Sequence, residues 1–154
     1  MTINNLDQYI AVHKSLYKHL NFDGSGIDVI LKGHLLIEEV LNKILERTVV
    51  STAPIKQANL SFYKTACVVK ALHEHECKEW VWDSIFSLNS IRNKLAHQLE
   101  INNIDDLIED FTLFVKTHGD GTKEFGDELG FYEEPMAIVN IHSELWRLLD
   151  KTKA

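Results

Sequence analysis

The chain has 154 residues, of which 45% are hydrophobic and 25% charged, a composition typical of a folded protein with one hydrophobic core. Its net charge of −7, from 16 Lys and Arg against 23 Asp and Glu, excludes a broad basic surface for nucleic acid, so any such contact must be local. No apolar run approaches the ~20 residues that span a bilayer and the start has no signal-peptide pattern, which predicts a cytoplasmic protein without a membrane segment.

Apolar residues recur every three to four positions along most of the chain, which is the spacing of amphipathic helices. Strand signals are nearly absent. We therefore predict an all-α, up-and-down bundle of four or five principal helices that forms a single domain over residues 1–154. In chain order, the predicted helices cover about Asn4–Leu20, Ile27–Arg47, Leu60–Glu74, Lys78–Asn102, Ile104–Thr117 and Pro135–Asp150.

Two segments between these helices lack the helical pattern. Thr48–Asn59 contains β-branched residues and Pro54, and we predict that it is a connection. His118–Glu134 combines four glycines with acidic residues, which predicts a long loop. Before the second helix, Ser25 or Asp28 is available as the N-cap.

The segment Arg92–His97, with the sequence RNKLAH, carries the most distinctive chemistry of the chain and lies on the last turns of the fourth predicted helix. Arg92 supplies a permanent positive charge with a planar set of donors that suits phosphate. His97 supplies an imidazole, the side chain that most often transfers protons near neutral pH. Together they are the smallest set of groups that could cleave RNA without a metal, because the imidazole can remove the ribose 2′-hydroxyl proton while the guanidinium stabilises the phosphate.

Helical geometry predicts how these side chains are related. Arg92 and His97 are five residues apart, which separates them by about 140° around an ideal helix. Asn93 lies four residues before His97 and therefore on the same face. We predict that Asn93 orients the imidazole, and that Arg92 and His97 reach one groove only with help from the helix end or from a partner.

The segment Arg92–His97 resembles the signature of HEPN domains (higher eukaryotes and prokaryotes nucleotide-binding). In that signature an arginine followed by Asn, Asp or His precedes a histidine on a late helix of an α-bundle, with four to six residues between them, and here there are four. The segment Gly33–Leu41 (GHLLIEEVL) is also similar to the second helix of such proteins. The resemblance covers about Ile27–Val115, which would be the core of the domain.

The resemblance implies a homodimer in which two copies of the segment face one cleft, and a metal-independent endoribonuclease of the kind found in toxins and antiviral defence. By position, Arg92 would stabilise the scissile phosphate, His97 would act as general base or acid, and Asn93 would hold the geometry. Cleavage would leave a 2′,3′-cyclic phosphate and a 5′-hydroxyl, with no metal or other cofactor. The implied partners are an RNA substrate, a second subunit and a cognate antitoxin or regulatory protein.

Other interpretations remain open at the level of sequence. An arginine and a histidine at a helix end also serve simply to cap carbonyls. The acidic net charge favours a non-catalytic HEPN-like interaction or regulatory module that binds a protein partner or a nucleotide. His73 and Cys77 are spaced to share a metal ion, but a turn between two helices is the simpler interpretation. His34 and Glu38, one helical turn apart, are predicted to form a buried pair.

Overall fold

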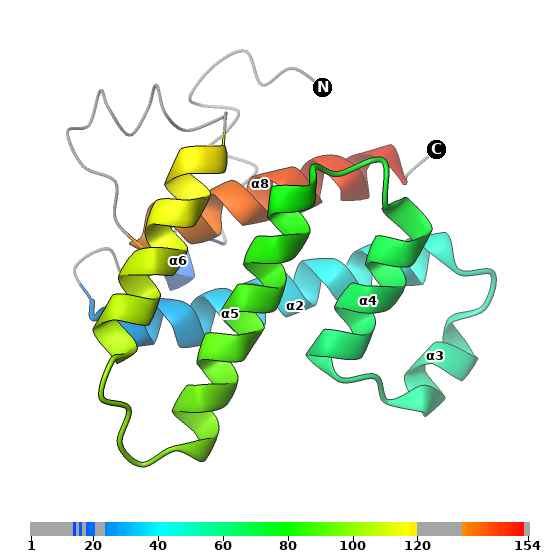
Figure 1. The fold of residues 1–154 in the computed structure, drawn as a ribbon. Helices are drawn as coiled ribbons and strands as arrows, with labels where there is room; N and C mark the ends of the chain where they lie inside the picture. The colour runs from blue at the N-terminus through cyan, green and yellow to red at the C-terminus, as the bar shows by residue number, and fades with distance from the viewer. Residues whose placement is uncertain (1–13, 15, 17, 21–23, 120–133, 153–154) are drawn as a thin grey trace.

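The computed structural model describes residues 14, 16, 18–20, 24–119 and 134–152, and this part of the chain is helical, without strands (Figure 1). Its helices are α2 (Gly26–Thr48), α3 (Thr52–Ala58), α4 (Phe62–His73), α5 (Glu79–His97), α6 (Ile104–His118) and α8 (Glu134–Lys151). Five of these have at least 12 residues, which confirms the predicted all-α bundle. The predicted first helix, Asn4–Leu20, and the predicted loop, His118–Glu134, lie largely outside the described residues.

The helices form two layers that cross each other (Figure 1). Helices α4, α5 and α6 lie side by side and alternate in direction, while α2 and α8 run across behind them. Helix α2 is central, because it contacts α4, α5, α6 and α8. Its buried positions repeat at three- and four-residue intervals over a wide face, which is what a helix needs to pack against several neighbours.

The hydrophobic core lies between the two layers. Each fully buried aliphatic side chain contributes roughly 1.5–3 kcal/mol to folding, so this burial is the main force that holds α5 in place. None of the described helices has the length and apolar character that crossing a lipid bilayer requires. The large side chains at the centre of the core are Ile37, Leu41 and Ile44 of α2, Trp82, Ile85 and Leu88 of α5, and Ile138, Ile141 and Leu145 of α8.

The connection predicted at Thr48–Asn59 is wrong in one respect, because it contains the short helix α3. Pro54 lies in the first turn of α3, where backbone N–H groups have no acceptor within the helix, so its missing N–H costs little. The helix ends at Asn59, whose φ of 48° is left-handed and is tolerated by asparagine. Helix α3 buries no residue, and therefore it has no apolar periodicity for the sequence to show.

Two helix ends bear on the candidate site. Of the two residues predicted as possible N-caps of α2, Ser25 is the cap. Its Oγ accepts a hydrogen bond of 3.3 Å from the backbone N–H of Asp28. Helix α5 ends at His97, before the end predicted at Asn102–Asn103, and Leu99 lies beyond it, fully exposed. His97 is therefore the last residue of its helix, where the backbone carbonyls lack partners in the helix.

Candidate functional site

The predicted site residues lie on the last two turns of α5. Arg92 is half-buried, whereas Asn93 and His97 are exposed. The preceding turns are anchored by the buried side chains of Leu88 and Ile91, which fix the direction of the helix end. The sequence thus places reactive side chains on the exposed end of a helix whose other turns belong to the core.

A shallow groove of about 440 Å³ lies beside His97, between α4 and α5. Asn93 and His97 both line it, so the structure brings two of the three predicted residues to one surface. Lys94 lines it as well and adds a positive charge that the sequence analysis did not single out, although its spacing of three residues from His97 indicates a shared face. Among the described residues, the lining consists of Tyr63 of α4, then Phe86, Asn89, Ser90, Asn93, Lys94 and His97 of α5, and Gln98.

Arg92 lies on a different side of α5 from His97. It is absent from the lining of the groove, and its charge acts on His34 of α2 instead. Its guanidinium donates a long hydrogen bond of 3.4 Å to Oδ1 of Asn93. The side chain of Asn93 is therefore hydrogen-bonded to Arg92, whereas the sequence predicted that it orients His97. One chain by itself does not bring Arg92 and His97 together, which agrees with the angle expected from their spacing.

His34 of α2 is hydrogen-bonded to Asn89 of α5, which lines the groove. The sequence had instead predicted Glu38 as the partner of His34. The Nε2 atom of His34 lies 3.3 Å from Oδ1 of Asn89, and the His34 ring stacks on Phe62 with the centroids 3.9 Å apart. Burial lowers the pKa of His34, Arg92 lowers it further, and the bond to Asn89 and the charge of Glu38 oppose this. We infer that His34 is neutral and donates its Nε2 proton to Asn89.

The segment His73–Cys77 ends α4 and turns toward α5, with His73 buried and Cys77 packed partly against the core. His73 Nδ1 lies 2.7 Å from Oε1 of Glu76, and His73 Nε2 lies 2.9 Å from Oγ1 of Thr48. Burial raises the pKa of the Cys77 thiol to about 11, so Cys77 stays protonated at neutral pH. The described part of the chain holds no group of three or more His, Cys, Asp or Glu suited to a metal ion.

A second hollow, of about 540 Å³, lies where the start of α2 meets α6 and α8. It is larger than the groove beside His97, but its charge is wrong for a polyanion. Among the described residues, Asp105, Glu109 and Glu134 line it together with one cation, Lys116. Three carboxylates against one ammonium repel phosphate, so size alone does not make this hollow the better candidate for an RNA site.

The groove beside His97 offers several of the groups that phosphodiester chemistry uses. His97 can transfer a proton, Lys94 can pair with one phosphate, and the amides of Asn89 and Asn93 can form hydrogen bonds. No protein-family model, curated protein or solved structure matches the chain. What the groove does is therefore inferred from these side chains and their positions.

Proposed function

We propose that this protein is a HEPN-like, metal-independent endoribonuclease that acts as a homodimer, with a role as a toxin or in antiviral defence. The observation that carries the proposal is the placement of the Arg92–His97 segment. The segment lies on the exposed last two turns of α5, with His97 and Lys94 in one groove and Arg92 on a different side of the helix.

In the proposed reaction, the imidazole of one His97 removes the proton of a ribose 2′-hydroxyl. The 2′-oxygen attacks the adjacent phosphorus, and the bond from phosphorus to the 5′-oxygen breaks. A protonated imidazole gives its proton to the departing oxygen, which leaves a 2′,3′-cyclic phosphate and a 5′-hydroxyl. Arg92 stabilises the negative charge that builds up on the phosphate in the transition state.

This reaction needs two imidazoles and a guanidinium near one phosphate, which is why the proposal includes a second subunit. Ile27, Leu31 and Leu35 form an apolar stripe on α2, four residues apart and 37%, 42% and 64% exposed. The stripe flanks His34, on which the charge of Arg92 acts. A second copy that packs on this stripe would cover apolar surface, which supports the dimer that the proposal requires.

The proposal predicts that the purified protein cleaves single-stranded RNA in the presence of EDTA. The products should carry a 5′-hydroxyl, which polynucleotide kinase labels without prior phosphatase treatment, and a 2′,3′-cyclic phosphate. An RNA with a 2′-deoxyribose at the cleaved position should resist, because it lacks the attacking hydroxyl. Cleavage that requires Mg²⁺, or that leaves 5′-phosphates, would contradict the proposed chemistry.

A second candidate function is a non-catalytic interaction module. The apolar stripe on α2 and the net charge of −7 favour it, because both fit a protein partner better than a polyanion. In this case expression in a bacterial host would be tolerated equally for the wild-type protein and for His97→Ala. Growth arrest by the wild-type protein alone would favour the nuclease.

A further inference from the structure

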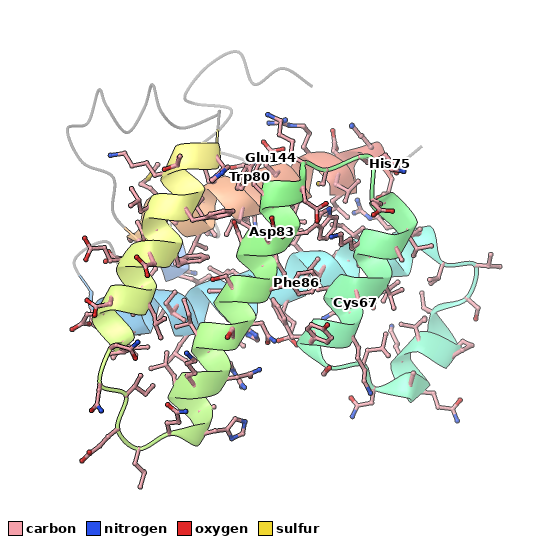
Figure 2. All side chains as sticks on the ribbon, in the orientation of Figure 1. Cys67, His75, Trp80, Asp83, Phe86 and Glu144 are labelled. Carbon is pink, nitrogen blue, oxygen red and sulfur yellow. The ribbon has the colours of Figure 1, made fainter. Side chains whose placement is uncertain are left out.

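Tyr63 and Phe86 form an aromatic pair in the groove that the proposed reaction does not use. Tyr63 is 55% exposed, more than any other Phe, Tyr or Trp that the structure describes. The two ring centroids are 5.4 Å apart and the ring planes are inclined by 53°. Phe86 lies on the side of α5 that is turned toward α4, so the pair bridges the two helices (Figure 2).

The ring of Tyr63 is held in a defined position. Its hydroxyl interacts with the side chain of Cys67, one turn further along α4, and this interaction raises the pKa of Tyr63. On the other side, Phe86 packs partly against the core and supports the ring. An aromatic face that is both fixed and accessible to solvent is suited to stacking, because a ligand does not have to immobilise it.

The remaining lining of the groove matches the polar edges of a nucleobase. Asn89 uses its Oδ1 for His34, so the group it can offer a ligand is its NH₂, a donor. Asn93 and Gln98 bring two further amides, each with donors and an acceptor. Base-paired nucleotides turn these edges toward each other and stack among themselves, whereas unpaired bases expose both edges and faces.

We propose that the groove binds single-stranded RNA, with an unpaired base stacked on Tyr63 and Phe86 and the strand continuing along α5 to His97. The part of this inference that concerns cleavage rests on the proposed function. Phe86 and His97 are eleven residues apart, or about 16 Å along the helix, so the stacked base lies some way along the strand from the cleaved bond. Tyr63 is thus a positioning residue, which sets the nucleotide that reaches His97.

Charge contributes little to this binding. Lys94 is the single Lys or Arg in the described lining of the groove, and the whole chain has a net charge of −7. Each phosphate neutralised on a single strand gives a slope of about −0.7 in a plot of log affinity against log salt. If binding depends on stacking, log affinity should fall only slowly with log salt. The expected slope is about −0.7, the value for one neutralised phosphate per groove.

The test uses the full-length protein with His97→Ala, so that the RNA stays intact. Fluorescence anisotropy measures its binding to a labelled, unstructured adenosine oligoribonucleotide. Adding Tyr63→Ala should weaken binding by about 5- to 150-fold, the loss measured when one stacking aromatic is removed. Tyr63→Phe keeps the ring and should bind like the parent, as should the control Leu72→Ala, which changes a 48% exposed residue of α4 outside the groove.

The results separate this inference from the proposed function. Binding that needs Tyr63 in a protein that never cleaves RNA would support the stacking site and contradict the nuclease. If the wild-type protein cleaves, Tyr63→Ala should raise KM and leave kcat unchanged. The inference is overturned if the His97→Ala protein binds no RNA, if Tyr63→Ala binds as well as the parent, if Tyr63→Phe loses as much as Tyr63→Ala, or if the matching RNA duplex binds as tightly as the single strand.

Discussion

Replacement of His97 with alanine is expected to slow RNA cleavage by about 10²- to 10⁴-fold, the contribution of a positioned group that transfers a proton in the transition state. His97 is exposed and is the last residue of α5, so its removal should leave the fold intact. Single-turnover cleavage rates in EDTA measure the effect.

The same assay on Arg92→Ala should show a loss of about 10²- to 10³-fold in the cleavage rate, as expected for a group that stabilises charge in the transition state.

His118 provides a matched control for His97. It is also an exposed histidine and the last residue of a helix, α6, where its Nδ1 lies 2.8 Å from the carbonyl oxygen of Phe114. It is not part of the groove beside His97. His118→Ala should cleave at the wild-type rate. The role assigned to His97 would be contradicted if His97→Ala cleaved RNA at the wild-type rate, or if His118→Ala lowered the cleavage rate as much as His97→Ala does.

Replacement of Gly33 with valine is expected to lower the free energy of unfolding by about 1–3 kcal/mol, the usual cost of forcing extra carbons into a packed core. A Cβ at Gly33 would lie 2.5 Å from Cδ1 and 2.7 Å from Cγ1 of Ile138, closer than carbon atoms can approach. A glycine inside a helix costs about 1 kcal/mol relative to alanine, so its presence here is explained by the close approach of α2 and α8. Urea denaturation measures the change.

The clash with Ile138 gives this prediction an internal control. Ile138→Ala removes the three carbons that a Cβ at Gly33 would meet, and by itself it should destabilise the protein by about 2–5 kcal/mol. In the double variant, Gly33→Val should cost less than it does in the wild-type background, because the space has been opened. Strictly additive costs would show that the two residues do not limit the approach of the helices.

The sequence predicted the fold well where a helix buries one continuous face. Helix α2 shows this best, because its ten buried positions recur at helical spacing and produce the apolar pattern directly. Helix α3 was missed for the same physical reason, since it buries no residue and leaves no pattern. Helix α5 was predicted to be too long, ending at Asn102–Asn103, because Leu99 continues the apolar spacing although the chain has already left the helix there.

The candidate site was predictable only in the part that one helix carries. Arg92, Asn93 and His97 stand out by residue type and spacing, and the angle between Arg92 and His97 follows from helical geometry. Spacing along the chain could not show that Tyr63, from another helix, closes the groove. Patterns within one helix likewise favoured Glu38 as the partner of His34, whereas the actual partner, Asn89, is 55 residues away.

The central claim is that two copies of His97, one from each subunit, act on a single phosphodiester. The direct test mixes wild-type protein with an equal amount of His97→Ala and allows the subunits to exchange, which co-purification of differently tagged chains verifies. Cleavage per total protein should fall to about one quarter, because random pairing leaves one dimer in four with both imidazoles. A fall to only one half would mean that each chain cleaves on its own, and would contradict the shared site.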